Sequence, residues 1–562
     1  MKKKDFIYCV DKEWGNRQYY SSTAYSLIFE TYITTENKMK LRCAKVYDGQ
    51  HIHTFNTITE LHEWYTELVK SYTKETVIFY TDDLGLANLF LSKDIEKRFA
   101  DKASYIYMYE DSAVKAKIEL RTLDGFLDNI DDARAELHIT DDEDVVVIQK
   151  YSQNLFDNIF IPERYFYISR FQYIRRKIKL AYKHQEDANM KNLKMKWNTY
   201  VMLGYAKRGG ICFNHYPYAR IDDELMHVDR TSAYIFDMLI EKYPCEAFKH
   251  ATMDYTNYDT AVYSFFGRFS IVYESTENIY FTTLYSDMRH TSLPIGHNIL
   301  VNDLWLTDVD LSILYTLVNI KEIKCYSLFV AKKDYMPRYM QEQIIDAYTK
   351  KVACKKTAGE DAFSYAQSKK QLNSIAGNLQ KKYTKEEDFN NASESICLAW
   401  GAWVTAYGRK NLLKLVLSIK NEDRFYGDTD SCFCLASAEN ERIVNELNNY
   451  TRTRVLKWCK YFGYDFNILK DLGQYEIKDY ITKFKANKTK VYCYETKSGN
   501  KVIKASGYRK DELNFEDMWE KDMLPARYAQ LRKREDDDEI YSYRIDACDF
   551  FLLQQAQDRL VF

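Results

Sequence analysis

The stretch between Tyr426 and Ser431 holds the side chains best placed to do chemistry. Its sequence is Tyr-Gly-Asp-Thr-Asp-Ser, with apolar runs on both sides, so Asp428 and Asp430 stand one residue apart. This pattern predicts a tight hairpin between buried strands, with both carboxylates at its tip. Such oxygen ligands bind hard divalent cations, and two cations about 4 Å apart stabilise the attacking and leaving oxygens of a phosphoryl transfer. The alternative is a plain surface turn, since these are also common turn residues.

A third carboxylate, Asp229, stands at the end of a strand predicted over residues 225–228. A helix is expected from 232 to 243, and its start would present backbone N–H groups to an anion. Next to the carboxylate, the backbone carbonyl of Arg230 can coordinate a metal. About one helical turn further, Tyr234 can form a wall beside the sugar of a bound nucleotide. The alternative role of Asp229 is that of a helix N-cap.

Between these carboxylates, residues 361–382 predict a helix on which Lys369 and Asn373 lie one turn apart, on the same face as Gly377. A cation suits a triphosphate, and a small residue leaves room for a base to approach. The stripe therefore indicates a nucleotide-facing surface. Its alternative is an ordinary solvated helix face.

The order of these elements resembles that of motifs A, B and C in family B DNA polymerases: Asp229, then the Lys/Asn helix, then the Asp-Thr-Asp hairpin. Residues 405–409, Thr-Ala-Tyr-Gly-Arg, resemble the TxxGR motif of that family, which contacts DNA. Residues 490–492, Lys-Val-Tyr, resemble its KxY motif near the primer terminus. Residues 304–311 resemble a segment of the first terminal-protein-region insertion, found in the protein-primed branch of small phages and linear plasmids.

The resemblance implies site residues position by position. The catalytic residues would be Asp229, Asp428 and Asp430. Two Mg²⁺ ions, or alternatively Mn²⁺, would be held by Asp229, Asp430 and the carbonyl of Arg230. The residues implied to bind the incoming dNTP are Tyr234, Lys356 (with a one-residue gap in the match), Lys369, Asn373 and Gly377. Those implied to contact the DNA primer-template are Gly209, Gly210, Thr405, Gly408, Arg409, Lys490 and Tyr492.

The resemblance also implies the architecture. We expect a multidomain chain of α/β and α+β class, with an RNase H-like, exonuclease-type domain followed by a right-hand polymerase of palm, fingers and thumb. The expected segments are 1–190 (exonuclease-like), 191–244 (palm with motif A), 245–335 (first insertion), 336–395 (fingers with motif B and a short loop), 396–505 (palm with motif C and KxY) and 506–562 (thumb).

Several positions depart from the family pattern. Ala376 precedes the motif B glycine, where the family has a Tyr, and the loss of this aromatic wall bears on fidelity. The stretch between Gly377 and Gly401 is short, although the second insertion, which supports processive strand displacement, falls there. The family's Tyr-x-Gly-Gly link reads Lys-Arg-Gly-Gly at residues 207–210.

The exonuclease motifs are the larger departure. The family uses four carboxylates for two metals, but the matching positions read Ile28, Gly85 and Phe171, and only Glu30 remains. One carboxylate cannot assemble a two-metal site. We therefore expect an exonuclease-like domain without proofreading, kept as a scaffold or strand guide. The alternative is another register, which restores a site through Asp11, Glu13, and Asp82 or Asp83.

The composition sets wider bounds. The chain has 562 residues, enough for three or four domains, and 46% of them are apolar, as in a well-packed globular protein. Because the net charge is only −2, a nucleic acid would have to bind at local basic runs such as 170–183 and 483–490. Such runs are also typical of solvated helix faces.

The 12 cysteines form no CxxC pair, which argues against a zinc or iron–sulfur module. No apolar run approaches transmembrane length, and charges interrupt the N-terminus before a signal-peptide core can form. We expect a soluble protein of a reducing compartment, the cytoplasm, which is that of the host if a phage encodes the chain.

We therefore expect a DNA-directed DNA polymerase that adds dNMPs to a 3′-hydroxyl during protein-primed replication of a phage or mobile-element genome. A terminal protein would supply the first hydroxyl and would bind at residues 304–311. One alternative is a catalytically silent nucleic-acid-binding homologue. Another is a polymerase of untemplated or defence-related synthesis, which Ala376 and the missing exonuclease motifs would fit. Primer extension with and without template separates the three.

Overall fold

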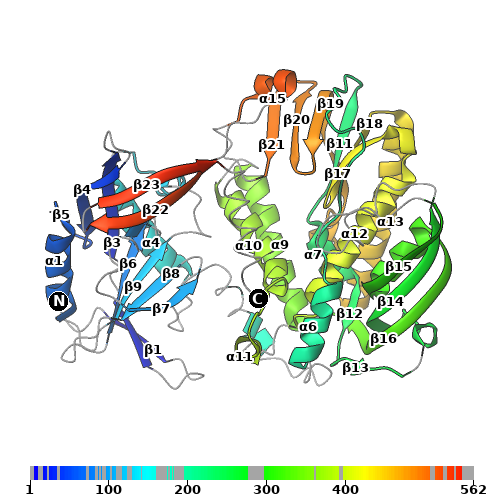
Figure 1. Cartoon of the computed structure of the whole chain (residues 1–562), viewed down its shortest axis with the longest axis horizontal. Helices are drawn as coiled ribbons and strands as arrows, with labels where there is room; N and C mark the ends of the chain where they lie inside the picture. Colours follow the sequence, from blue (N-terminus) through cyan, green and yellow to red (C-terminus); the bar gives the residue numbers. More distant parts are fainter. Residues whose placement is uncertain are drawn as a thin grey trace. The chain divides into compact units, whose positions relative to one another are not determined.

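The computed structural model describes the chain over the following ranges: 6–10, 17–21, 25–33, 38–70, 75–82, 86–87, 90, 96–101, 104–108, 117–122, 130–140, 142–159, 174, 178–179, 181–182, 195–252, 254–275, 296–359, 363–390, 397–506, 513–522, 528–536 and 539–546. The chain divides into two compact units (Figure 1). The first comprises Met1–Tyr173, Thr357–Gln367 and Ala526–Phe562. The second comprises Ile174–Lys356 and Ser368–Pro525.

The first unit is built on an 11-stranded sheet with the order β22-β23-β4-β3-β6-β9-β8-β7, to which β1, β2 and β5 are added at the side. Its strands are β1 (Phe6–Val10), β2 (Arg17–Ser21), β3 (Tyr25–Ile33), β4 (Lys38–Tyr47), β5 (Ile52–Phe55), β6 (Glu75–Thr81), β7 (Glu96–Asp101), β8 (Ser104–Met108), β9 (Lys117–Thr122), β22 (Tyr528–Asp536) and β23 (Glu539–Asp546). Its helices are α1 (Ile58–Lys70), α3 (Ile130–Leu137) and α4 (Asp144–Ile159). The mixed α/β character predicted for this region is confirmed.

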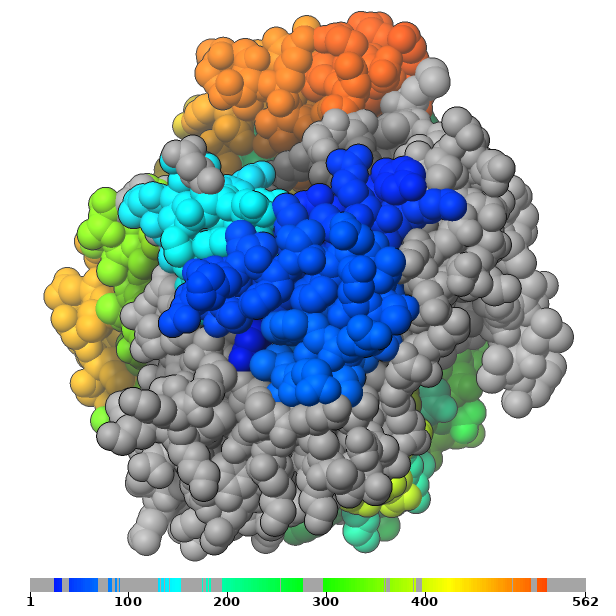
Figure 2. Space-filling model, turned by 90° about the vertical axis from the view of Figure 1, so that its left-hand side faces the viewer, coloured from blue at the N-terminus to red at the C-terminus, as the bar shows by residue number. Residues whose placement is uncertain are grey.

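Helix α4 packs on β3, β4 and β6 and completes the core of this unit. In the space-filling view, the cyan surface of α3 and α4 adjoins the blue surface of the early strands (Figure 2). Residues 145–148, Val-Val-Val-Ile, have the composition typical of a strand but lie inside this helix. Val145, Ile148 and Tyr151 are buried at helical spacing against Ile28 and Tyr80. A short run of Val and Ile does not by itself distinguish a strand from a buried helix.

The second unit contains two sheets. A seven-stranded sheet has the order β10-β17-β18-β11-β19-β20-β21, and a five-stranded sheet has the order β12-β16-β14-β15, with β13 paired to β16. The strands are β10 (Cys212–Asn214), β11 (Leu225–Arg230), β12 (Lys242–Pro244), β13 (Lys249–His250), β14 (Tyr263–Ser275), β15 (Gly296–Thr307), β16 (Asn319–Tyr335), β17 (Arg424–Asp428), β18 (Ser431–Leu435), β19 (Tyr475–Lys488), β20 (Val491–Thr496) and β21 (Lys501–Ala505). The helices are α6 (Trp197–Ala206), α7 (Ala233–Ile240), α8 (Asp308–Leu317), α9 (Arg338–Ala358), α10 (Phe363–Leu379), α11 (Glu386–Asn390), α12 (Trp400–Ser418), α13 (Ala438–Phe462), α14 (Phe466–Leu469) and α15 (Phe515–Lys521). The last two residues of α9 and the first five of α10 fall within Thr357–Gln367 of the first unit.

The elements expected around the site are present in this unit. The hairpin of β17 and β18, the strand β11 and the helices α9, α10 and α12 all form close to their predicted bounds. Helix α7 is shorter than predicted, because residues Lys242–Pro244 leave the helix and pair with β16.

The tail departs from the expectation of one thumb domain over 506–562. Helix α15 packs on β20 and β21 in the second unit. The hairpin of β22 and β23 instead joins the sheet of the first unit, where β23 pairs with β4. The stretch is therefore divided between the two units, and most of its described residues are strands.

Candidate active site

The Asp-Thr-Asp turn forms the tip of the β17–β18 hairpin. Thr429 has φ 61°, and the N–H of Asp430 donates to the carbonyl of Asp428 at 2.6 Å, which closes the turn. The N–H of Thr429 donates to the carbonyl of Ile211 at 2.7 Å. A Cβ added at Gly210 would lie only 2.9 Å from Cγ2 of Thr429. The segment 210–211 therefore packs closely against the tip of the hairpin, and only glycine fits at position 210.

The sheet brings Asp229, near the end of strand β11, close to Asp430, which lies in the turn that leads into the adjacent strand β18, as predicted from the sequence. In the antiparallel register of β11 and β18, Asp229 is opposite Ser431. The N–H of Arg230 extends this ladder by donating to the carbonyl of Asp430 at 3.1 Å. Two carboxylates separated by about 200 positions in the chain thus lie at the same end of the sheet.

Both carboxyl groups of this pair are perturbed. Burial, followed by the charges of Asp229 and Asp428, raises the pKa of Asp430 to about 7. Burial also raises the pKa of Asp229, against the opposing effect of Lys478 and Lys369. Like charges held together in this way favour a bound cation, which relieves their repulsion.

Asp428 lies in a different environment from this pair. Its Oδ1 accepts hydrogen bonds from Nζ of Lys490 at 2.9 Å, Sγ of Cys212 at 2.9 Å and Oγ1 of Thr429 at 2.7 Å. A carboxylate already neutralised by a lysine is a poorer metal ligand. Asp428 therefore fits a structural or positioning role better than a metal-binding one, in agreement with the greater weight placed on the other two residues.

The donor set of the site is small. In the part of the chain that the structure describes, no group of three or more His, Cys, Asp or Glu side chains gathers to hold a metal. Asp229 and Asp430 supply two carboxylates, and the carbonyl of Arg230 follows directly in the chain. Mg²⁺ is commonly held by one or two carboxylates together with substrate phosphates. The residues present fit a cation that is bound jointly with a nucleotide.

Lysines from three elements surround this carboxylate pair. Burial, followed by the charges of Lys369, Lys355 and Lys478, lowers the pKa of Lys351 to about 8. Its Nζ donates to Oγ of Ser232 at 3.0 Å. Like charges gathered beside a carboxylate pair form a site for a polyanion such as a triphosphate.

Further ion pairs tie the same lysines to strand β19. Nζ of Lys355 lies 3.8 Å from Oε1 of Glu476, and Lys478 also pairs with Glu476. Lys351 was not among the residues singled out from the sequence. The sequence feature that could have identified Lys351 is its spacing of four residues from Lys355, which puts both side chains on one face of α9. Lys356, the residue predicted instead, lies at an exposed position on α9.

The predicted stripe on α10 is present. Lys369 and Asn373 are exposed and Gly377 is partly exposed, whereas Leu372 and Ile375 are fully buried. Lys369 is close enough for its charge to lower the pKa of both Asp229 and Lys351. The amphipathic helix thus buries its apolar face and exposes its polar stripe. Lys369 is the residue of this stripe that lies close to Asp229.

Tyr234 lies at the start of α7, after Ser232, whose φ of 51° and ψ of 49° are left-handed. Burial, followed by the charge of Asp430, raises the pKa of the Tyr234 hydroxyl to about 12. The phenol therefore stays neutral beside the carboxylate pair. The structure brings Tyr234 to the site, as predicted.

The KxY residues lie beside the hairpin. Lys490 contacts Asp428, and its N–H donates to the hydroxyl of Tyr426 at 2.7 Å. The ring of Tyr492 packs against Tyr426 and Phe433, with ring centroids 4.9 and 5.4 Å apart. The pair thus buttresses motif C from the hairpin formed by β19 and β20.

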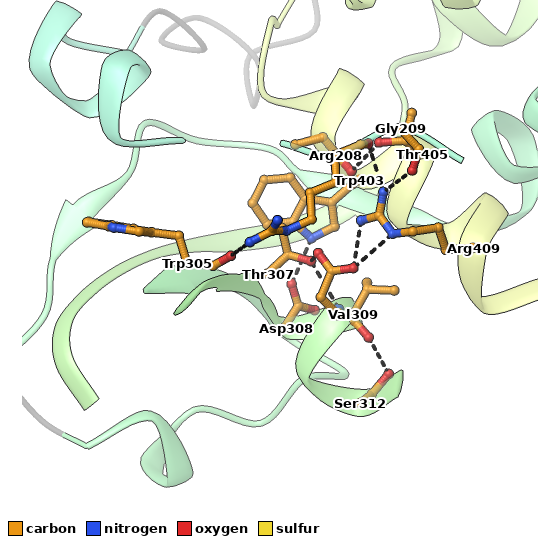
Figure 3. Close-up of polar contacts among 12 residues, drawn as sticks. Arg208, Gly209, Trp305, Thr307, Asp308, Val309, Ser312, Trp403, Thr405 and Arg409 are labelled. Carbon is orange, nitrogen blue, oxygen red and sulfur yellow. Dashed lines mark hydrogen bonds and ion pairs between the residues drawn. The ribbon is translucent and has the colours of Figure 1, made fainter. Parts of the chain in front are cut away.

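The TxxGR residues are buried, which corrects their predicted contact with DNA. The side chain of Arg409 is 1% exposed and donates through Nη1 to the carbonyls of Arg208 and Gly209, both at 2.8 Å (Figure 3). The hydroxyl of Thr405 donates to helix carbonyls of α12. These side chains hold the protein together and do not present themselves to a nucleic acid.

Residues 304–311, predicted to meet a terminal protein, are also part of the interior. Asp310 is fully buried and accepts from Nη2 of Arg409 at 2.6 Å. Asp308 accepts from Nε1 of Trp403 at 2.7 Å (Figure 3). Oγ1 of Thr307 donates to the other oxygen of Asp310 and caps α8. The acidic side chains of this segment are paired with residues inside the protein, so they are not available to bind another protein.

The exonuclease positions in the first unit hold no carboxylate cluster among the residues described. Ile28 is buried in the apolar core, and Glu30 pairs with Lys45 at 2.8 Å. Lys45 also contacts Glu143 at 2.8 Å. Asp82 is described and accepts a hydrogen bond from Thr81. The remaining positions lie outside the described residues: Asp11, Glu13, Asp83, Gly85 and Phe171.

Comparisons with known proteins identify the fold of this chain. No protein-family model and no curated protein sequence matches the chain. Among solved structures, it is similar to phi29 DNA polymerase complexed with primer-template DNA and incoming nucleotide substrates, with TM-score 0.67 and 14% identity, covering 93% of this chain and 99% of that chain. The orthorhombic crystal form of phi29 DNA polymerase gives TM-score 0.63 and 14% identity over 93% and 98% of the two chains. Its complex with single-stranded DNA gives the same TM-score and identity over 88% and 94%.

The fold expected from the order of the motifs, that of a family B DNA polymerase, is thereby confirmed. It is in particular the fold of the phi29 DNA polymerase, and nearly the whole length of both chains takes part. Within the described residues, every helix is too short or too polar to cross a lipid bilayer.

Proposed function

We propose that this protein is a DNA-directed DNA polymerase that extends a 3′-hydroxyl with dNMPs. The observation that carries the proposal is the placement of Asp229, on β11, beside Asp430, in the turn before the adjacent strand β18. Lys369 and Lys478 lie close to Asp229, and Lys351 lies close to both lysines. Carboxylates for divalent cations next to cations for a polyphosphate are the parts that phosphoryl transfer requires. Solved phi29 DNA polymerase complexes with primer-template DNA and nucleotides share the fold and support the choice of partners.

Each residue of the site would have a separate role in the reaction. Asp229, Asp430 and the carbonyl of Arg230 would hold Mg²⁺, which lowers the pKa of the attacking hydroxyl and neutralises the triphosphate. Lys351 and Lys369 would bind and orient the phosphates. Tyr234 would border the sugar, and Asn373 and Gly377 would border the base pair.

We also propose that the first unit does not proofread. Burial of Ile28 and neutralisation of Glu30 by Lys45 support this, because the first carries no charge and the second is already paired. Initiation from a terminal protein remains part of the proposal. Since residues 304–311 are buried, the surface for such a partner would have to be formed by other residues.

A primer-extension assay tests the proposal directly. The purified full-length chain, with Mg²⁺ and all four dNTPs, should extend an annealed primer and insert the base that the template specifies. Asp430→Ala should abolish insertion and leave binding of primer-template largely unchanged. No extension by the wild-type protein would favour a silent homologue, and extension without a template would favour untemplated synthesis.

A further inference from the structure

Glycine at position 408 is required by a close approach between two helices of the site. A Cβ built on Gly408 in α12 would lie 2.8 Å from Cε1 and 3.4 Å from Cδ1 of the Tyr234 ring. Helices α7 and α12 pack against each other at this point. Contacts under 3.0 Å are essentially absent for real Cβ atoms, so the ring and a methyl group cannot occupy these positions together.

The ring has limited freedom to yield. Tyr234 is followed by Ile235 and Phe236, which are both fully buried and anchor α7 in the core. The same Gly408 position also approaches a second group, because the added Cβ would lie 3.8 Å from Oδ2 of the buried Asp237. An aromatic ring is rigid, so a methyl group there must displace the ring as a whole and not only its tip.

We infer that Gly408 is a specificity-determining position: it sets the location of the Tyr234 ring and thereby the preference for deoxyribonucleotides over ribonucleotides. This inference rests on the proposed function, in which Tyr234 borders the sugar. A wall in contact with the sugar distinguishes two substrates that differ by one hydroxyl, and such discrimination depends on its exact fit to one of them.

Displacement of the ring should change the selectivity, and the sign of the change reports the direction in which the ring moves. If the ring moves away from the sugar, the ribonucleotide gains affinity, and the ratio of kcat/KM for dNTP to kcat/KM for the matching rNTP falls. If the ring moves toward the sugar, both nucleotides lose affinity, and the ratio changes according to which of them loses more.

The test compares Gly408→Ala with wild type in single-nucleotide insertion on a DNA primer-template. We expect the dNTP/rNTP ratio to change by about tenfold or more, which is the range that one misplaced methyl group produces in a shaped pocket. Gly204→Ala is the matched control, since Gly204 is also in a helix and has nothing within 4 Å of an added Cβ. Thermal unfolding and the Kd for primer-template verify that Gly408→Ala folds and binds DNA.

A double-mutant cycle separates action through the ring from a general structural effect. Tyr234→Val alone should lower the ratio, and Gly408→Ala should then have no further effect in the Tyr234→Val background. An unchanged ratio in Gly408→Ala, or an equal effect of Gly408→Ala in both backgrounds, would overturn the inference. A wild-type chain that inserts no dNTP at all would instead refute the proposed function.

Discussion

Arg409 and Asp310 form a fully buried ion pair, with Nη2 of the arginine 2.6 Å and Nε 3.1 Å from Oδ1 of the aspartate, across 99 positions of the chain. The same guanidinium donates to the carbonyls of residues 208 and 209. The next residue, Gly210, packs against Thr429 at the tip of the catalytic hairpin. One buried cation therefore connects the five-stranded sheet region, helix α12 and the segment that holds motif C.

Removal of one partner of this pair should destabilise the chain strongly. Asp310→Asn keeps the volume but leaves the buried guanidinium without its counter-charge, which costs about 3–5 kcal/mol of unfolding free energy. Urea unfolding of the full chain measures the loss. Glu446→Gln is the control, because Glu446 forms an exposed pair with Arg442, and its loss should leave the unfolding free energy nearly unchanged. A similar small effect in both variants would show that the buried pair does not stabilise the fold.

Substitution of Gly210 should impair the chemical step. A methyl group at this position meets Cγ2 and Oγ1 of Thr429 at 2.9 and 3.0 Å and must displace the tip that carries Asp430. We expect Gly210→Ala to lower kcat for nucleotide insertion by about 10²-fold, since a misplacement of about 1 Å has effects of that size.

The same contact predicts a rescue. Thr429→Ser removes Cγ2 and keeps the hydroxyl that donates to Asp428 at 2.7 Å. The double variant Gly210→Ala with Thr429→Ser should recover part of kcat, whereas Thr429→Ser alone should resemble wild type. Failure of this rescue, with both proteins folded, would mean that Gly210 acts by another route, such as contact with DNA.

Binding of the nucleotide should weaken at alkaline pH. The pKa of Lys351 is lowered from its ordinary value of 10.5 to about 8, so the fraction of charged ammonium falls as pH rises through 8. KM for dNTP should therefore rise between pH 7 and 9. Lys351→Arg keeps its charge throughout this range, so its KM should depend less on pH. Parallel profiles for the two proteins would exclude Lys351 as the titrating group that binds the phosphates.

Degradation of a 3′-mismatched primer should be absent in the wild-type chain with Mg²⁺. Ile28 offers no ligand and Glu30 is engaged by Lys45, so no two-metal site is expected there. Release of labelled mononucleotide from single-stranded DNA measures the activity. Mismatch removal that disappears in Asp11→Ala would reveal a site built from another register.

The sequence revealed the site largely through order and spacing. Asp229, Asp430 and Tyr234 were found because strand ends, a tight turn and a helix start impose recognisable local patterns. Their approach across the sheet followed from the motif order of a known fold, since no local rule sets the register between β11 and β18. The hairpin and the helices of the second unit were likewise predicted from local sequence patterns.

Other features could not be predicted from the sequence, because they depend on tertiary contacts. Burial decides the role of Arg409, whose residue type alone suits both a phosphate and an internal carboxylate. Residues 304–311 resembled a recognition segment, but their acidic side chains are neutralised inside the protein. Lys351 was not identified from the sequence, because only tertiary packing buries it and brings it close to Lys369 and Lys478. The hairpin at 528–546 was assigned to the thumb, because its pairing partner, β4, lies near the other end of the chain.

The rate of single-nucleotide insertion in isosteric variants tests the central claim most directly. Asp229→Asn and Asp430→Asn should each lower the rate at saturating Mg²⁺ and dNTP by at least about 10³-fold, because each removes a charge that the reaction centre needs. Asp428→Asn should lose less than about tenfold, since Asp428 is already paired with Lys490. Near wild-type insertion by Asp430→Asn, in a protein that binds primer-template normally, would contradict the assignment of this carboxylate pair as the centre of nucleotidyl transfer.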